Sequence, residues 1–320
     1  MRPLDLTHPF VFEPILMERI WGGRRLETDF GKPLPPHRKI GESWEIVDRP
    51  EAESVVREGP WRGQTLHDLW TNHRGEIFGP LPDGPRFPLL IKLLDARDKL
   101  SLQVHPPAHI AEQLSGEPKT EFWYVAKADP GAQLFVGLGQ ATSVEDFKAS
   151  IADGTVAERI HTISVQAGDA MFLPAGRFHA VGAGNLLVEV QQNSDTTYRV
   201  FDWNRKDEQG KLRELHIDLA LQSIDFTDCR PELVRPRGEM LVSHPLFEVQ
   251  KWSVTAPREI NDRGSFAIVC LLEGTLDCAG VRLQPGDLCL VPAESPNRTV
   301  RPGSPESSLL RITIPVEPRN

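Results

Sequence analysis

Short apolar runs that end near glycine or proline recur along most of this chain. Four of them, FPLLIKLLDA, KLSLQVHP, EFWYVAKA and AQLFVGL, follow one another after residue 86, and similar runs occupy 161–181 and 186–192. An earlier run, GESWEIV, covers 41–47. Apolar runs of this length bounded by turn residues are typical of strands. The pattern therefore predicts a mainly β protein.

Two segments depart from this pattern and predict short helices. Residues 142–160 are the clearest case, with Thr142 or Ser143 as the N-cap and acidic residues in the first turn, where the helix dipole favours them. Gly154 is expected to divide this segment in two. A second short helix is predicted over Thr65–Asn72, with Thr65 as its N-cap.

The strand pattern also predicts two related halves. QAGDAMFLPAG (166–176) and LQPGDLCLVPA (283–293) share a Gly-Asp turn, an alternating apolar strand and a Pro-Ala end. A segment rich in proline and charge, 226–241, lies between the halves and predicts a linker. We expect two β-barrels with a few short helices, one in residues 1–225 with an N-terminal extension and one in residues 240–320.

Composition limits the classes of function. The 320 residues carry a net charge of −9, which argues against general nucleic-acid binding but allows a local positive pocket for an anionic substrate. No apolar run approaches the roughly 20 residues of a membrane helix, and the first residues do not read as a signal peptide. The four cysteines lie in the last third without metal-binding spacing and are expected to be buried thiols in a reducing cytoplasm.

The first candidate site lies in the run Leu102–His105. In a strand, Gln103 and His105 would project from one face, where a metal ion could bind both an amide oxygen and a ring nitrogen. Taken alone, the pair is equally compatible with a hydrogen-bonded core histidine. Glu121, at the start of an aromatic strand, could be a third ligand or a surface residue.

A stronger signal surrounds His179. The segment from Gly168 to His179 fits the pattern G-x5-P-x-G-x2-H. In this pattern the first glycine makes a turn, Pro174 ends a strand, and Gly176 allows the chain to reverse. His179 would then begin the returning strand and point into the barrel. The geometry predicts a metal-ligating role for His179.

Several motifs in one collinear order resemble the type I mannose-6-phosphate isomerases, in their short bacterial form, within the cupin superfamily. The resemblance covers roughly residues 8–220. It is carried by GESWEI (41–46), LLIKLLDARDKLSLQVHP (89–106), KTEFWYV (119–125), GDAMFLPAGRFHAV (168–181) and LVEVQQNSDTTYRVFDWNR (187–205). It implies two cupin-type (jelly-roll) barrels and an enzyme that interconverts mannose 6-phosphate and fructose 6-phosphate.

The resemblance also implies roles for individual residues. One zinc ion per chain would be bound in the first barrel by Gln103, His105, Glu121 and His179. This donor set of nitrogen and oxygen without thiolate suits zinc, but also Fe(II), Mn or Co. Arg199, Glu189 and Lys119 are the implied catalytic residues, and Lys92, Ser101 and Arg199 the implied substrate-binding residues.

Each of these roles has a structural alternative. Arg199 could instead form a structural ion pair with Asp195 or Asp202. Glu189 could be a base, a partner of a metal ligand, or a residue of the strand surface. The proton-transfer base is therefore left open.

Two other functions remain possible at this stage: an Fe(II) cupin oxygenase, and a sugar-binding regulator that keeps the metal for structure. The glutamine ligand and the GESWEI to YRVFDW context argue against the oxygenase. The joint presence of Arg199, Lys119 and Glu189 favours catalysis over regulation.

The second half lacks the four ligand types, with LEGT at 272–275 and AESPNRTV at 293–300, so we expect no metal there. We further expect that the protein binds a phosphosugar, that it binds neither nucleic acid nor a membrane, and that it is a monomer or a homodimer.

Overall fold

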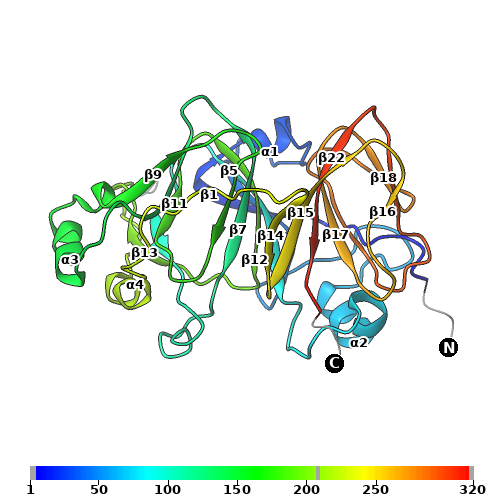
Figure 1. Ribbon diagram of the computed structural model, residues 1–320, viewed down its shortest axis with the longest axis horizontal. Coiled ribbons are helices and arrows are strands. Elements are labelled where there is room, and N and C mark those ends of the chain that lie inside the picture. Colours follow the sequence, from blue (N-terminus) through cyan, green and yellow to red (C-terminus); the bar gives the residue numbers. More distant parts are fainter. Residues whose placement is uncertain (1–4, 207–209, 317–320) are drawn as a thin grey trace.

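The first half of the molecule is built around a six-stranded antiparallel sheet (Figure 1). The structure is a computed structural model that describes residues 5–206 and 210–316. In spatial order the strands are β1 (Ile15–Gly23), β2 (Ile40–Ile46), β5 (Leu89–Ala96), β12 (Asn185–Gln192), β7 (Glu121–Ala128) and β10 (Ala170–Leu173).

A five-stranded sheet faces this sheet and completes the first pair. Its strands are β13 (Tyr198–Phe201), β6 (Leu102–Val104), β11 (His179–Val181), β8 (Gln133–Leu138) and β9 (Ile160–Ser164). Side chains from both sheets meet in one buried cluster, with Leu94 and Leu187 from the larger sheet and Leu134 and Val181 from the smaller. The space between these two sheets contains the candidate site.

The second half contains a similar pair of sheets. Its five-stranded sheet has the order β14 (Met240–His244), β15 (Phe247–Val254), β22 (Ser307–Thr313), β17 (Ala267–Glu273) and β20 (Leu288–Val291). Its four-stranded sheet has the order β16 (Arg258–Glu259), β21 (Thr299–Pro302), β18 (Leu276–Cys278) and β19 (Val281–Leu283). A small ladder of β3 (Asp48–Arg49) and β4 (Ala52–Glu53) lies apart from both pairs.

The expectation of a mainly β chain with few helices is confirmed. The expected closed barrels are not: within the described residues, the hydrogen-bonded ladders leave the two sheets of each pair separate. Side-chain packing rather than strand pairing holds each pair together, as in a sandwich. The division at 225 and 240 stays a prediction, and we refer to the two sheet pairs as the first and the second unit.

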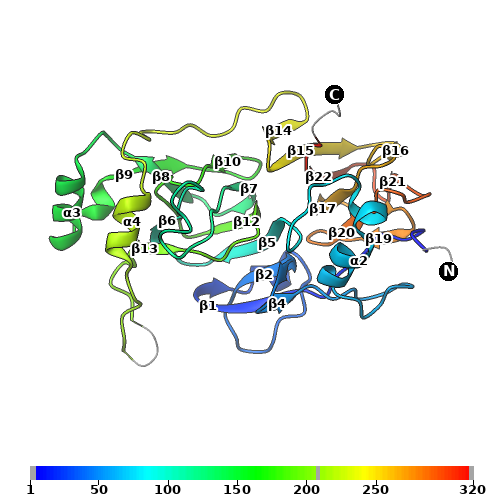
Figure 2. The same cartoon turned by 90° about the horizontal axis from the view of Figure 1, so that it is seen from below.

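The largest hydrophobic core lies between the two units. Strand alternation places Leu93 and Val190 on the outer face of the six-stranded sheet, and Val249 and Ile312 on the facing sheet of the second unit; all four are buried in one cluster. The second unit thus covers the outer face of the first, and Figure 2 shows the two units side by side, with the sheet that contains β15 and β17 next to the six-stranded sheet. This packing leaves the inner face of the six-stranded sheet free to carry polar side chains.

The two predicted helices are present, with different bounds. Ser143 caps α3 (Val144–Ala152) by accepting from the Asp146 amide, and Gly154, at φ 81°, separates it from the 3-10 turn η1 (Val156–Glu158). Thr65 caps α2 (Leu66–Phe78) as predicted. The backbone is non-helical at His73 (φ −137°, ψ 27°), directly after the predicted end at Asn72, so a kink divides α2 there. The part after the kink buries Ile77 and Phe78 in the core between the units.

Two further short helices, α1 (Arg25–Thr28) and α4 (Ile217–Ser223), complete the described helices. The longest helix, α2, has 13 residues, and among the described residues no helix combines the length and hydropathy needed to cross a membrane.

The internal repeat corresponds to a repeated turn and strand. Asp169 accepts from the Gln166 amide at 2.8 Å, and in the second unit Asp287 accepts from the Gln284 amide at the same distance. The glycines of the two turns have φ values of 96° and 86°, a backbone region that favours glycine. Each turn leads into the last strand of its sheet, β10 or β20.

The predicted linker is fixed to the first unit before it enters the second. Asp228 forms a two-point ion pair with Arg177 at 2.7 and 2.8 Å, and the Val234 amide donates to the carbonyl of Ala170. The linker therefore supports the strand and turn that precede His179.

The four cysteines are free thiols, as expected. Three of them are buried, and Cys229 is half-buried. The Sγ atoms of Cys278 and Cys289 lie 3.5 Å apart in the core of the second unit.

Candidate metal centre and active-site cavity

One row of site residues crosses the smaller sheet of the first unit. His179 on β11 is paired with Gln103 on β6, and Gln103 is paired in turn with Arg199 on β13. The neighbours Leu102 and Val104 point the other way into a buried apolar cluster, so strand alternation directs Gln103 toward the opposite sheet. This register places an imidazole, an amide and a guanidinium side by side.

A second row crosses the inner face of the six-stranded sheet. Glu189 on β12 is paired with Lys92 on β5 and with Trp123 on β7, and Glu121 lies two residues from Trp123 on the same face. The alternating residues of these strands pack into the core between the units. Glu121 therefore faces the row of His179 and Gln103 across the space between the sheets.

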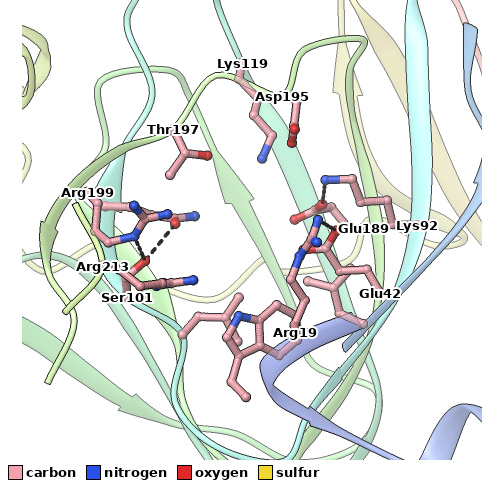
Figure 3. A pocket seen from close by; sticks show the side chains of 14 residues that line it. Arg19, Glu42, Lys92, Ser101, Lys119, Glu189, Asp195, Thr197, Arg199 and Arg213 are labelled. Carbon is pink, nitrogen blue, oxygen red and sulfur yellow. Dashed lines mark hydrogen bonds and ion pairs between the residues drawn. The ribbon is translucent and has the colours of Figure 1, made fainter. Parts of the chain in front are cut away.

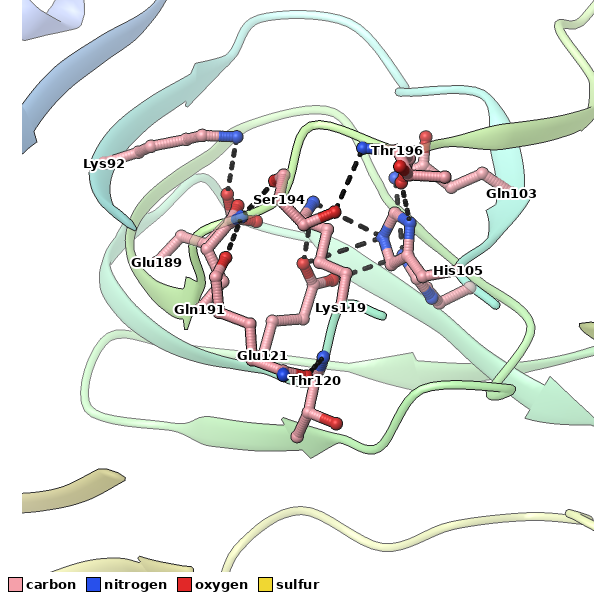
Figure 4. A network of polar contacts seen from close by, with 12 residues as sticks. Lys92, Gln103, His105, Lys119, Thr120, Glu121, Glu189, Gln191, Ser194 and Thr196 are labelled. Atoms are coloured by element: carbon pink, nitrogen blue, oxygen red, sulfur yellow. Dashed lines mark hydrogen bonds and ion pairs between the residues drawn. The ribbon is translucent and has the colours of Figure 1, made fainter. Parts of the chain in front are cut away.

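The two rows meet in a buried group of metal-ligand type. The ligand atoms of His105, Glu121 and His179 all lie within 4.8 Å of one another. The Glu121 carboxylate is 3.2 Å from Nε2 of His179 and 3.7 Å from Nε2 of His105 (Figure 4). Ligands around a tetrahedral zinc ion with bonds of about 2.1 Å are roughly 3.4 Å apart, so these separations match such a site.

The other nitrogen of each histidine is held by the backbone. Nδ1 of His105 lies 2.7 Å from the carbonyl oxygen of Thr196, and Nδ1 of His179 lies 2.8 Å from that of Arg177. A carbonyl only accepts, so each Nδ1 must carry the proton and donate. Each Nε2 is then left with its lone pair directed at Glu121, the arrangement found around metal-bound histidines.

The electrostatics of this group favour the ligating forms. Burial, and then the Lys119 ammonium, lowers the pKa of His105 to about 3, and burial also lowers the pKa of His179. Burial alone would raise the pKa of Glu121, but the Lys119 ammonium beside it outweighs burial and holds the pKa well below its usual range. The group thus offers two neutral imidazoles and a carboxylate. Both Glu121 oxygens are buried and lack a well-formed hydrogen bond from the described residues, which fits a group built to receive a cation.

Gln103 and Lys119 complete the surroundings of this group. The Gln103 amide nitrogen lies 3.3 Å from Nε2 of His179, and turning the amide by 180° would place its oxygen there as a ligand. The Lys119 ammonium is 3.0 Å from Glu121. Burial alone would lower the pKa of Lys119, but Glu121 and Glu189 outweigh it and raise the pKa. Lys119 is therefore a fixed positive charge beside the carboxylate.

A cavity of about 370 Å³ opens beside this group (Figure 3). Five cationic and three acidic side chains line it, so its charge is net positive although the chain is acidic. The size suits a single small polar ligand. The charged lining residues are Arg19, Glu42, Lys92, Lys119, Glu189, Asp195, Arg199 and Arg213.

Arg199 is tied to the metal group through a serine. Its Nε donates to Ser101 Oγ at 3.3 Å, and Ser101 donates in turn to the Gln103 oxygen at 3.3 Å. The predicted alternative, an ion pair of Arg199 with Asp195 or Asp202, is not found among the described residues, and Asp202 pairs with Arg205 and Arg213 instead. Arg199 and Arg213 thus lie together on one wall of the cavity.

Glu189 and Lys92 form a buried ion pair on the opposite wall, with a separation of 3.3 Å. Glu189 also accepts from the Trp123 indole at 2.9 Å. Burial, together with the nearby Glu121, raises the pKa of Glu189 despite Lys92 and Lys119. All the predicted site residues are therefore brought to one place, and none of them lies on the outer surface of a strand.

Some of the cavity residues were not predicted. Arg19 and Glu42 come from the N-terminal segment, Thr197 lies just before β13, and Arg213 follows it. Their sequence surroundings contain no ligand pattern. The signals were two motifs used for the resemblance rather than for the site: GESWEI contains Glu42, and LVEVQQNSDTTYRVFDWNR contains Thr197.

Comparison with known proteins decides the family. The profile described as "Phosphomannose isomerase type I, catalytic domain" matches residues 10–132. A mannose-6-phosphate isomerase of Streptococcus mutans is 38% identical over 301 residues, which are 90% of this chain and 93% of that protein. The chain belongs to the type I phosphomannose isomerase family. It is accordingly an enzyme of the mannose-6-phosphate isomerase class.

Two further family members agree. Mannose-6-phosphate isomerase ManA of Bacillus subtilis is 39% identical over 278 residues, covering 84% of this chain and 86% of that protein. The crystal structure of a mannose 6-phosphate isomerase from Bacillus subtilis superimposes with a TM-score of 0.84 and 34% identity, covering 96% of this chain and 99% of the other. The phosphomannose isomerase resemblance is thus confirmed, and it extends into the second unit.

Proposed function

We propose that this chain is a zinc-dependent isomerase that interconverts mannose 6-phosphate and fructose 6-phosphate through an enediol-type intermediate. The observation that carries the proposal is the position of the buried group His105, Glu121 and His179 beside a positively lined cavity, with the half-buried Gln103 between the group and the cavity. The family relationship supports the choice of substrate. We also propose that each of the two sheet pairs is a cupin-type jelly roll of two packed sheets and that only the first holds the metal.

The four ligands would hold one zinc ion, which when bound would act as a Lewis acid toward the oxygens at C1 and C2 of the open sugar. The donor set suits this role because it contains no thiolate and leaves room for substrate oxygens. The same donors also accept Fe(II), Mn or Co, so loading in the cell depends on metal availability.

The Arg199 wall is suited to bind an anion. Its guanidinium is held by Ser101 and by the carbonyl of Glu214, at 2.9 Å, while Asp202 holds Arg213 beside it. Guanidinium groups bind phosphate and developing oxyanions through paired hydrogen bonds. We infer that Arg199 contacts the substrate, with Ser101 and Arg213 supporting the same wall.

Glu189 is our candidate for the group that moves the proton. It lines the cavity, and its raised pKa brings it closer to the range in which a carboxylate works as a general base near neutral pH. Lys92, paired with it, would contact sugar oxygens. Lys119 would supply fixed positive charge on the metal side of the cavity.

The test is an assay on the full chain after chelation and zinc reconstitution. Mannose 6-phosphate is supplied, and the formation of fructose 6-phosphate is followed with and without zinc. Turnover that depends on zinc supports the proposal, whereas substrate binding without any zinc-dependent turnover would contradict it. Side-by-side loading with Fe(II), Mn and Co would show how strictly the site selects zinc, and the absence of oxygen consumption would separate it from a cupin oxygenase.

A further inference from the structure

Strand β1 contains an irregularity that brings its middle residues to the cavity. Glu18 and Gly23 are both paired with Ile40 of β2, so the four residues between them leave the ladder. We call residues 19–22 the arch. A β-bulge of this kind redirects side chains. Arg19 and Trp21, both in the arch, line the cavity.

Glycine in β2 allows the arch to lie close to the sheet. A Cβ atom added at Gly41 would lie 2.6 Å from the Cβ of Arg19 and 2.6 Å from the ring of Trp21. Both separations are far below van der Waals contact. The Cβ of Arg19 is bonded to the backbone, so it could not move aside without moving the strand. Gly41, the residue directly before Glu42, therefore allows the arch to lie close to β2, and this determines where Arg19 enters the cavity.

Arg19 and Glu42 form a two-point ion pair inside the cavity. Nε and Nη2 of Arg19 donate to the two carboxylate oxygens of Glu42 at 3.2 and 3.1 Å. The indole of Trp44, two residues further along the strand, donates to Glu42 at 2.7 Å. Three donors on two different strands thus hold the carboxylate in place.

Lys92 is the diagonal neighbour of Glu42 on the adjacent strand β5, since Glu42 is paired with Leu94 and Trp44 with Lys92. Its ammonium is 5.0 Å above the ring of Trp44, and on the other side it reaches Glu189 at 3.3 Å. Arg19, Glu42, Lys92 and Glu189 therefore form a row of alternating charges along one side of the cavity (Figure 3). Lys92 is the only one of the four that has a carboxylate on each side.

We propose that Glu42, held by Arg19 and Trp44, is a positioning residue that keeps the Lys92 ammonium between two carboxylates and directed at the substrate. A cation beside a single carboxylate at low dielectric is drawn fully to it. Without the charge of Glu42, Lys92 would close on Glu189 and withdraw its remaining N–H groups from the cavity. This inference rests on the proposed isomerase function, which gives Lys92 a substrate to contact.

The decisive variants are Glu42→Gln, which keeps the size of the side chain but removes its charge and one of its two accepting oxygens, and Glu42→Asp, which keeps the charge. For Glu42→Gln we expect kcat to fall by at least about tenfold, because small displacements of a positioned group are costly, while KM changes less than about threefold. Glu42→Asp should recover a large part of kcat. Zinc content should stay at the wild-type level in both. Arg38→Gln, which removes an exposed ion pair with Glu18 on the same strand, is the matched control and should behave as wild type.

A crystal structure of the Glu42→Gln variant gives a second, activity-independent result. We expect Lys92 Nζ to lie closer to Glu189 in the variant than in a crystal structure of the wild-type protein solved in the same crystal form. An unmoved Lys92, or wild-type kcat in Glu42→Gln, would overturn the inference. If wild-type protein failed to isomerise mannose 6-phosphate, the proposed function would fall, while the position of Lys92 in the variant would still decide whether Glu42 positions it.

Discussion

The two units share a frame and differ in what that frame holds. In the first unit, β10 pairs with β7 so that Leu173 lies opposite Glu121. In the second, β20 pairs with β17 so that Val291, the residue equivalent to Leu173 in the repeated motif, lies opposite Ala267. The second unit thus has a methyl group at the position of the carboxylate ligand.

The two units also differ at the equivalent positions of the next strand and of the returning loop. Glu189, opposite Trp123, corresponds by register to Arg311, opposite Val269. Counting from the proline of each repeat, His179 corresponds to Asn297. The comparison teaches that the Gly-Asp turn and the apolar faces suffice for the fold, whereas the chemistry depends on a few inward side chains that can change without changing the frame.

The largest expected effect comes from removing His179 in the first unit. His179→Ala should lose most bound zinc and reduce kcat/KM by at least about a thousandfold, because the site loses an imidazole ligand and leaves Glu121 unmatched. Elemental analysis of dialysed protein and the mannose 6-phosphate assay would measure both. The matched control is Asn297→Ala at the equivalent position of the second unit, which should keep wild-type zinc and turnover. If the two substitutions reduced zinc content and turnover equally, the proposed difference between the units would be wrong.

Arg199 separates substrate chemistry from metal binding. Arg199→Ala should keep full zinc content but lose about 10²–10³ in kcat/KM, because the cavity loses its best-placed guanidinium. Arg263→Ala, an exposed arginine of the second unit, serves as control. If Arg199→Ala lost its zinc, the residue would have to be reassigned to a structural role through Ser101 and Gln103.

The second unit should respond in stability rather than in metal binding. Leu309 on β22 is fully buried in its core, and Leu309→Ala is expected to lower the free energy of unfolding by about 3 kcal/mol through the cavity it leaves. Urea unfolding measures this loss. The number of zinc ions per folded chain should not change. A loss of zinc in this variant would show that the packing of the second unit affects metal binding in the first.

The smallest effect concerns pH. Burial would raise the pKa of Glu42, but Lys92 and Arg19 outweigh it and lower the pKa from 4.5 to about 2. A depressed carboxyl pKa stabilises the fold above the unfolded value, and this stabilisation is lost as the pH falls from about 4.5 toward 2. Across that window, metal-free wild-type protein should lose roughly 2–3 kcal/mol more stability than Glu42→Gln. Glu58→Gln, an exposed site, is the control; parallel curves for wild type and Glu42→Gln would contradict the assignment.

Much of the frame and of the candidate site could be predicted from the sequence because local chemistry determines them. The turn glycines and the proline before His179 define the loop that presents the histidine, and strand alternation places Gln103 and Glu121 on inward faces. Capping chemistry likewise identified Ser143 and Thr65. These features depend on neighbours within a few residues of the chain.

The missing parts depend on contacts between distant segments. Arg19 reaches the cavity only because the arch leaves the ladder and crosses Gly41, which no periodicity indicates. Arg213 is placed by an ion pair with Asp202. The predicted closure of the barrels was also wrong for the described ladders, because closure depends on hydrogen bonding between sheet edges and not on the apolar pattern of single strands.

The most direct test of the central claim is the coordination of zinc in the reconstituted full chain. Zinc titration combined with X-ray absorption should give one ion per chain with nitrogen and oxygen ligands at about 2.0–2.2 Å, including imidazole. That result would match the donors of the first unit, which include imidazole and carboxylate but no thiolate. A second tightly bound ion, or a sulfur ligand at about 2.3 Å, would contradict the account.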